Sequence, residues 1–203
     1  MSAAFNKLAD YADTLPNSRM RTSHDVAGAI RLMCQMVDAK KVLDIGTFTG
    51  CSAVVAAEQV GKAGKVTTCD KDDAHQKVFE EVFNEVGLGD VIEFVNAPAM
   101  DLVQELVANG EANTFDLAFL DADKRNYQTY FDLCLELVRP GGVVIVDDTL
   151  WMGKVVGEID SSDARLVAML EFNEKMATDE RVTNLVLPIG NGLTIALKQP
   201  ESG

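Results

Sequence analysis

Apolar residues along this chain recur with two alternating spacings. Short runs rich in valine, isoleucine and leucine predict strands at residues 41–45, 65–69, 91–95, 115–120 and 142–146. Between them, apolar residues at helical spacing predict helices at residues 22–37, 51–60, 73–86, 99–108 and 127–138. Strands that alternate with helices favour an α/β fold built on a Rossmann-like, doubly wound sheet that is mostly parallel.

The two ends of the chain depart from this alternation. After a helix predicted at about residues 163–178, two strand-like runs at 181–187 and 193–197 are separated only by the five residues 188–192, PIGNG. So short a link allows a hairpin but no parallel crossover, so we expect the sheet to finish with an antiparallel strand. At the other end, a short amphipathic pattern interrupted by Pro16 predicts a loosely docked helix in a variable segment, residues 1–20. Residues 1–203 are expected to form a single domain.

Charge and composition exclude several classes of function. The formal net charge is −14, which disfavours binding to the phosphate backbone of nucleic acids. The four cysteines lie far apart in apolar segments without a CxxC pair, which is typical of buried thiols in a reducing compartment. No apolar run is long enough to cross a bilayer and no leader pattern is present, so we expect a soluble, cytoplasmic protein.

Acidic side chains follow two of the predicted strands at the point where each strand ends. The segment 115–127, FDLAFLDADKRNY, places Asp121, Asp123 and Lys124 after one strand, and GGVVIVDD places Asp147 and Asp148 after the next. The carboxyl ends of parallel strands meet at one edge of a sheet, so Asp121 and the Asp147–Asp148 pair should converge if the strands are neighbours. Oxygen ligands without Cys or His favour Mg²⁺, Mn²⁺ or Ca²⁺ over zinc. The alternative is a set of helix caps and solvated loop acids.

Two further residues near these acids have both a functional and a structural interpretation. A lysine beside a divalent cation has a lowered pKa and can act as a general base, although most lysines at the position of Lys124 only solvate a helix face. Trp151 is the only tryptophan and follows the aspartate pair in DDTLWMG. It forms either the wall of a pocket or a packing contact.

A glycine turn and a downstream acid indicate a nucleoside cofactor. Residues 46–50, GTFTG, join a strand to a helix, where glycine permits close approach of a ligand and helix amides face anionic groups. Asp70 ends the next strand and suits a carboxylate that accepts ribose hydroxyls, or else a plain helix N-cap. The loop lacks the third glycine of GxGxxG, and no Tyr precedes a Lys by four residues. These features favour S-adenosylmethionine over an NAD(P)-dependent oxidoreductase, and a non-catalytic nucleoside-binding module remains an alternative.

Six segments taken together resemble the cation-dependent O-methyltransferases of the caffeoyl-coenzyme A and catechol type. The resemblance runs from about Met20 to Lys198 and is carried by VLDIGTFTGCSA, KVTTCD, FDLAFLDADKRNY, GGVVIVDDTLWMGKV, FNEKMATDERV and LPIGNGLTIALK. It implies S-adenosylmethionine as methyl donor, a divalent cation with Mg²⁺ first, a small vicinal diphenol (a phenolic catechol) as acceptor, and a homodimer.

The same resemblance implies a role for individual residues. It assigns the metal to Asp121, Asp147 and Asp148, the base to Lys124, and the acceptor pocket to Trp151 and Asp121. It assigns the cofactor to Thr22, Asp44, Gly46, Thr47, Ser52, Asp70, Ala99 and Asp123.

The chain also departs from this family. The family usually has Asp-Asn where Asp147–Asp148 stands and commonly Asp-Gly where Asn191–Gly192 stands. The cation site would therefore carry one more negative charge, offset if Asn191 faces the same pocket. Ala97 replaces a usual glycine. The N-terminal extension and the loop that helps plant enzymes of the family hold coenzyme A are short or missing, which weakens the case for a coenzyme A ester as acceptor.

Overall fold

One mixed sheet forms the centre of the computed structural model, which describes residues 1–157 and 159–200. Within these residues seven strands lie in the order β3-β2-β1-β4-β5-β7-β6. Neighbours among β1 to β5 are parallel, and β7 pairs antiparallel with both β5 and β6. The predicted α/β fold with an antiparallel C-terminal hairpin is confirmed. The strands are β1 (Lys41–Ile45), β2 (Lys65–Asp70), β3 (Ile92–Asn96), β4 (Phe115–Leu120), β5 (Val138–Val146), β6 (Val182–Leu187) and β7 (Leu193–Lys198).

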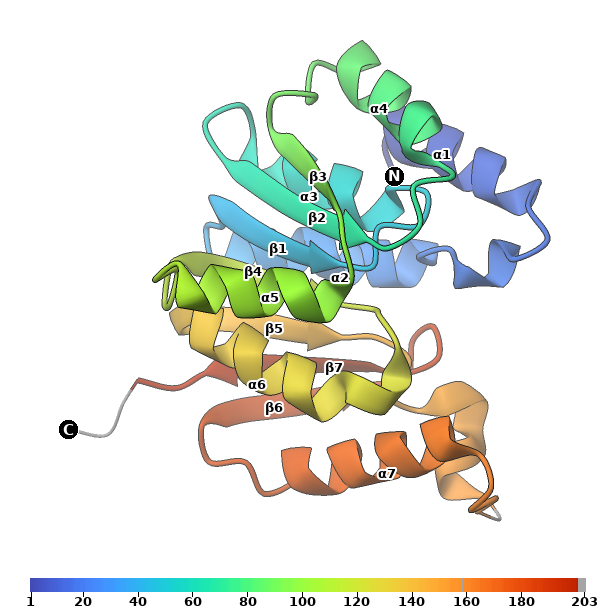
Figure 1. The fold of residues 1–203 in the computed structure, drawn as a ribbon, viewed down its shortest axis with the longest axis vertical. Coiled ribbons are helices and arrows are strands. Elements are labelled where there is room, and N and C mark those ends of the chain that lie inside the picture. Colours follow the sequence, from blue (N-terminus) through green and yellow to red (C-terminus); the bar gives the residue numbers. More distant parts are fainter. Residues whose placement is uncertain (158, 201–203) are drawn as a thin grey trace.

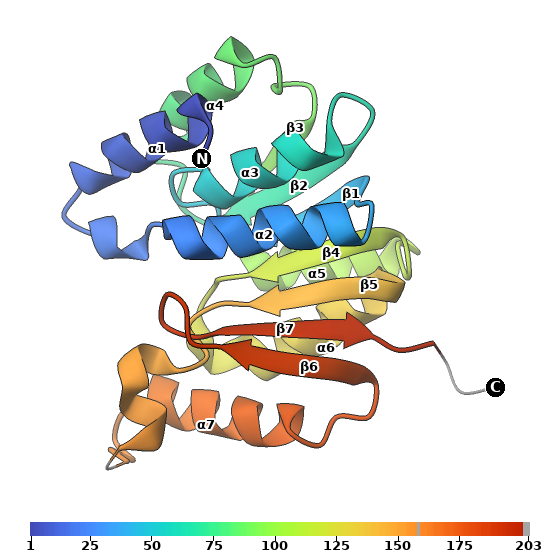
Figure 2. The ribbon, with the colours of Figure 1, turned by 180° about the vertical axis from the view of Figure 1, so that it is seen from behind.

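Helices cover both faces of the sheet. In Figure 1 α5, α6 and α7 lie on the near face, and Figure 2 shows α2 and α3 on the opposite face with α1 and α4 beyond them. The helices are α1 (Ala3–Asp13), α2 (His24–Met36), α3 (Cys51–Val60), α4 (Gln76–Glu85), α5 (Ala99–Ala108), α6 (Tyr127–Leu137) and α7 (Ala164–Met176). Over the part of the chain that the structure describes, three short 3₁₀ helices that the apolar pattern did not predict are η1 (Ser18–Met20), η2 (Lys124–Asn126) and η3 (Trp151–Val156).

Successive residues of each strand point to opposite faces, and so the sheet separates two apolar cores. Val42, Leu117 and Ile145 belong to the core under α1 to α4. Leu43, Ala118 and Val144 belong to the core under α5 to α7. The central strands are therefore apolar on both faces, which explains why their sequences read as continuous apolar runs.

Two predictions about particular elements were wrong. The helix in the variable segment is firmly rather than loosely docked, because the side chains of Phe5 and Leu8 are fully buried in the first core. Strand β5 begins at Val138 instead of residue 142, since Val138 pairs with Phe115 before a register shift. The remaining element ends agree with the predicted ranges to within about three residues.

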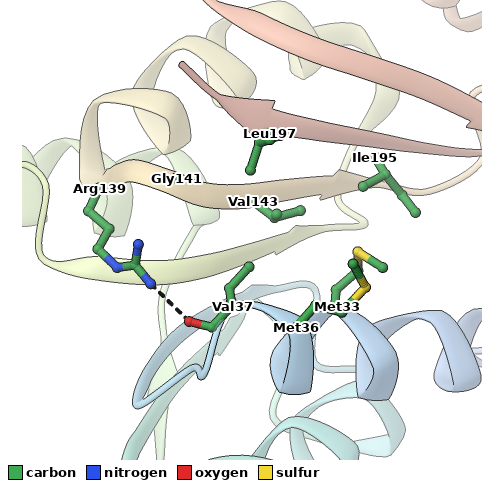
Figure 3. A pocket seen from close by; sticks show the side chains of 8 residues that line it. All are labelled: Met33, Met36, Val37, Arg139, Gly141, Val143, Ile195 and Leu197. Carbon is green, nitrogen blue, oxygen red and sulfur yellow. Dashed lines mark hydrogen bonds between the residues drawn. The ribbon is translucent and has the colours of Figure 1, made fainter. Parts of the chain in front are cut away.

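Part of the sheet lies outside the cover of the helices. On the side of α2, the ribbon of β7 and β6 is uncovered (Figure 2), and the side chains of Leu185 and Leu197 are exposed there. A groove beside it lies between α2 and the amino-terminal part of β5 (Figure 3). There Arg139 Nη2 donates to the Val37 carbonyl at 2.9 Å. None of the predicted site residues lines this groove.

Two remaining expectations concern the chain as a whole. Within the described residues, every helix is too short or too polar to cross a bilayer. The organisation of residues 1–203 as a single domain stays a prediction, and residue 158 and residues 201–203 lie outside the described part of the chain.

Candidate functional site

The carboxyl ends of β1 and β4 meet where the sequence predicted the site. Asp121 N–H donates to the Ile45 carbonyl at 2.8 Å, and Asp147 N–H donates to the Leu120 carbonyl at 3.0 Å. Gly46 has a φ of +107°, and a Cβ at this position would overlap the Asp121 carbonyl oxygen. Only glycine permits this contact, because its conformation is left-handed and the space for a side chain is filled. The glycine turn is thereby held against the acidic segment that follows β4.

Lys124 brings the predicted acids together. Its Nζ donates to Asp121 Oδ1 at 2.6 Å and forms an ion pair with Asp148 Oδ2 at 2.8 Å. Asp147 completes the cluster, since its Oδ1 accepts the backbone N–H of Asp148 at 2.8 Å. Asp121, Asp147, Asp148 and Lys124 thus converge from the ends of two neighbouring strands, as predicted.

Burial and mutual repulsion shift the pKa values of this cluster. Burial, followed by the charges of Asp121 and Asp148, raises the pKa of Asp147 to about 8. Burial also raises the pKa of Asp121, with Asp148 acting in the same direction and the Lys124 charge opposing them. Burial disfavours the ammonium form of Lys124, but the neighbouring Tyr127, Asp121 and Asp148 outweigh it and raise the pKa of the lysine well above its usual value. Lys124 is therefore an ammonium ion in this arrangement, whereas a base requires the opposite shift.

The structure leaves the predicted metal untested. Within residues 1–157 and 159–200, no three His, Cys, Asp or Glu side chains are arranged as a ready metal site. The Lys124 ammonium itself bridges two of the three predicted ligands. Assignment of a metal to Asp121, Asp147 and Asp148 accordingly stays a prediction.

Asn191 faces this cluster from the turn between β6 and β7. Its Nδ2 donates to Asp148 Oδ1 at 2.9 Å. The adjoining Gly190 lies near both sides of this edge, since a Cβ added there would be 3.8 Å from both Asp147 Oδ1 and Ser23 Oγ. The turn thus joins the acids to the start of α2, where Ser23 caps the helix by accepting the Val26 N–H at 3.3 Å. The expectation that Asn191 could offset the extra aspartate is supported by this contact.

Asp44, one of the predicted cofactor residues, lies at the carboxyl end of β1. Thr68 Oγ1 donates to Asp44 Oδ2 at 2.6 Å and contacts Thr47 Oγ1 at 2.7 Å. Burial raises the pKa of Asp44 to about 7, and the hydrogen bond from Thr68 opposes this shift. In the described part of the chain, Asp44 Oδ1 has no hydrogen-bond partner although it is buried. An unpaired buried carboxylate oxygen is costly, so this atom fits a donor group of a bound molecule.

Asp70 organises the outer part of the same edge. Its carboxylate accepts the N–H of Phe48 at 3.0 Å and that of Asp72 at 3.1 Å. Its carbonyl accepts the N–H of Ala97 at 3.1 Å, so the start of α5 at Ala99 lies close to the end of β2. The predicted acid and the predicted glycine turn are thus connected directly. Asp70 is not the N-cap of a helix, since α4 begins only at Gln76.

Other predicted site residues have mainly structural contacts. Asp123 accepts hydrogen bonds from Asn126 Nδ2 and Tyr130 Oη, both at 3.0 Å, and so stabilises its own turn. Arg165 stacks on the Trp151 ring at 5.4 Å from its centroid. Thr22 and Ser52 are buried at the starts of α2 and α3. The roles assigned to these residues by resemblance stay predictions.

The sequence did not predict one residue of the cluster, Tyr127. Tyr127 is buried, and its hydroxyl accepts a short hydrogen bond from Lys124 Nζ. The only sequence signal is its spacing of three residues from Lys124, which places both side chains on one side of a helical turn. Such a spacing also occurs in many core tyrosines, so it does not by itself identify a partner of the lysine.

The family is identified by comparison with known proteins. Caffeoyl-CoA O-methyltransferase 1 of Eucalyptus globulus is 33% identical, over 89% of this chain and 75% of the relative. The mouse catechol O-methyltransferase domain-containing protein 1 is 38% identical, over 82% of this chain and 63% of the relative. The crystal structure of the O-methyltransferase TomG from Streptomyces achromogenes in complex with SAM superposes with a TM-score of 0.86 at 28% identity, covering 98% of this chain and 91% of that one. A sequence profile of the O-methyltransferase family matches residues 2–199, and the chain belongs to this family.

Proposed function

We propose that the chain is an S-adenosylmethionine-dependent, divalent-cation-dependent O-methyltransferase that acts on a small vicinal diphenol. The observation that carries the proposal is the convergence of Asp121, Asp147, Asp148 and Lys124 beside the Gly46 turn. This edge unites a group of oxygen ligands with a turn suited to a nucleoside. Membership in the O-methyltransferase family provides the reaction class.

Two features of the cofactor side support S-adenosylmethionine. The TomG structure, 28% identical to this chain, contains SAM. In this chain the unpaired Asp44 Oδ1 fits a donor such as an ammonium group, and Asp70 provides a carboxylate next to the backbone of the glycine turn. S-adenosylmethionine would supply a methyl group on a sulfonium centre. Asp44 and Asp70 would bind and orient S-adenosylmethionine.

The donor set supports a hard divalent cation. Three carboxylates gather with no sulfur or imidazole in the described cluster, which suits Mg²⁺ first and Mn²⁺ or Ca²⁺ after it. In the structure the positive charge beside these acids is the Lys124 ammonium group, which pairs with Asp121 and Asp148. Burial, and after it the charges of Asp121 and Asp148, raises the pKa of Asp147, and a bound cation would oppose that shift. A bound cation would supply Lewis-acid activation of the diphenol oxygens.

Lys124 is the group that we expect to accept the proton of the reacting hydroxyl. Its Nζ is held by Asp121, Asp148 and Tyr127, which fixes its position at the edge of the sheet. These neighbours also keep it protonated, so it becomes a base only when the two carboxylates no longer face it. Trp151 follows the cluster on the same segment and is the predicted wall of the acceptor pocket. Arg165 lies over its ring, 5.4 Å from the centroid.

The competing functions receive no support from the family match. An NAD(P)-dependent oxidoreductase and a non-catalytic nucleoside-binding module were the alternatives, and the profile match is to O-methyltransferases. The names of two relatives contain caffeoyl-CoA and catechol, and we favour the small catechol for this chain.

Calorimetric titration followed by a turnover assay tests the proposal. S-adenosylmethionine should bind and NADH should not, and methyl transfer to a simple catechol should require Mg²⁺. Chelation with EDTA should abolish turnover, and added Mg²⁺ should restore it. Turnover that survives exhaustive chelation would remove the cation from the proposal, whereas absence of binding to S-adenosylmethionine would remove the cofactor.

We also propose the homodimer that the family resemblance implies. Sedimentation velocity over a range of protein concentrations measures the mass directly. A species of twice the mass of the 22.0 kDa chain supports the proposal, and a monomer at all concentrations contradicts it.

A further inference from the structure

The turn that carries Asn191 is fastened to the segment that follows the cluster aspartates. Thr149 N–H donates to the Gly192 carbonyl at 3.0 Å, and Leu150 N–H donates to the Asn191 carbonyl at 2.9 Å. Gly192 has a φ of +94°, and a Cβ there would overlap the Leu150 backbone nitrogen. These contacts fix the main chain at Asn191 relative to the segment that follows Asp147 and Asp148, although the Asn191 side chain is exposed.

The two oxygens of Asp148 have different partners. Oδ1 accepts from Asn191 Nδ2 at 2.9 Å, whereas Oδ2 pairs with Lys124 Nζ at 2.8 Å. The backbone of Asp148 is in the left-handed region at a φ of +64°, which is uncommon for a residue other than glycine. Asn191 contributes a neutral donor at a place where a further carboxylate would repel Asp148.

We propose that Asn191 is a positioning residue, which holds the Asp148 carboxylate by Oδ1 so that Oδ2 keeps facing Lys124 Nζ, in the cluster that would bind the cation. The inference rests on the proposed divalent-cation dependence. Asn191 itself need not contact the cation, because its effect is exerted through the orientation of Asp148. Without this hydrogen bond Oδ1 loses its partner while Oδ2 still pairs with Lys124, so a cation that replaces the ammonium group must supply the cost of ordering the carboxylate.

Manganese binding measures this role without any turnover. Free Mn²⁺ is quantified by electron paramagnetic resonance during titration of the protein, with and without S-adenosylmethionine. Asn191→Leu removes the donor at similar size, and Asn109→Leu changes an exposed asparagine at the end of α5 as a matched control. We expect Asn191→Leu to weaken Mn²⁺ binding about five- to ten-fold, the scale of one hydrogen bond to a partly exposed charge, with unchanged thermal unfolding. The control should bind as the unaltered chain does.

An exchange of the two side chains tests the pairing itself. Asp148→Asn alone removes one carboxylate from the cluster and should weaken Mn²⁺ binding more than Asn191→Leu. Asp148→Asn combined with Asn191→Asp restores both the charge count and the hydrogen bond, with the amide now on residue 148. The combined variant should bind Mn²⁺ more tightly than Asp148→Asn.

The outcomes separate this inference from the proposed function. If the unaltered chain does not bind Mn²⁺, the cation dependence fails and the inference fails with it. If the unaltered chain binds Mn²⁺ and Asn191→Leu binds it equally well or better, only the positioning role is overturned. An exchange variant no better than Asp148→Asn also overturns it, since the paired geometry would then have no effect.

Discussion

Gly46 lies against the main chain of Asp121, in a contact that leaves no room for a β-carbon. A Cβ at Gly46 would overlap the Asp121 carbonyl oxygen, and the φ of +107° is unfavourable for any other residue. One glycine thus connects the predicted cofactor turn with the predicted cation cluster. A substitution of Gly46 should therefore disturb the predicted cofactor turn and the predicted cation cluster together.

Gly46→Ala should lower the free energy of unfolding by at least about 2 kcal/mol, because backbone strain and a steric clash act together. Urea denaturation measures the loss, and calorimetry should show weakened binding of S-adenosylmethionine. Gly87→Ala is the matched control, since its φ is +70° but a Cβ there has open space. Its cost should be limited to backbone strain of about 1 kcal/mol. Equal losses in the two variants would contradict the contact with Asp121.

Lys124→Ala should reduce kcat by at least about a hundred-fold while KM for the catechol changes little, because the proposed base acts on the reacting proton. Steady-state kinetics with Mg²⁺ at saturation separates the two constants. Lys124→Arg retains the charge that Asp121 and Asp148 pair with but cannot act as a base near neutral pH. It should remain folded and nearly inactive. Turnover preserved in either variant would exclude Lys124 from the role.

Asp44 should make stability depend on pH. Its pKa is raised from 3.8 to about 7 in the folded chain, so the folded state holds a proton that the unfolded state releases. The resulting stabilisation is present below about pH 4 and is lost as the pH rises through about 7. Asp44→Asn removes this titrating group. As the pH rises from about 4 to about 7, the unaltered chain should therefore lose stability relative to the variant. Urea denaturation at several pH values measures it, and a difference independent of pH would contradict the raised pKa.

Asp70→Asn should weaken the binding of S-adenosylmethionine by about ten-fold, which corresponds to loss of one charge-assisted hydrogen bond. The side-chain oxygen of asparagine can still accept the Phe48 N–H, so the turn should retain its shape. Calorimetry gives the affinity, and kcat at saturating cofactor should change little. Asp73→Asn, which changes an exposed acid in the loop before α4, is the control. Unaltered affinity in Asp70→Asn would remove Asp70 from the cofactor site.

Local pattern was sufficient to predict most of the fold. Apolar runs at residues 41–45 and 115–120 correspond to β1 and β4, and the five-residue link before Leu193 correctly excluded a parallel crossover. Such features depend on side-chain periodicity and loop length, which neighbouring residues determine among themselves. The prediction that the first helix is loosely docked was wrong, because Phe5 and Leu8 are buried by packing against α3 and α4, which lie far along the chain.

The sequence by itself also determined which acids would be candidates, since Asp121, Asp147 and Asp148 each follow a strand that ends at one edge of a parallel sheet. Only the tertiary structure decided what those acids contact. The ion pair of Lys124 with Asp148 joins the segments that follow β4 and β5, and the hydrogen bond from Asn191 to Asp148 reaches it from the β6–β7 turn, 43 residues away along the chain. The pKa values follow from the same source, because burial and the charges of neighbours exist only after the strands have assembled.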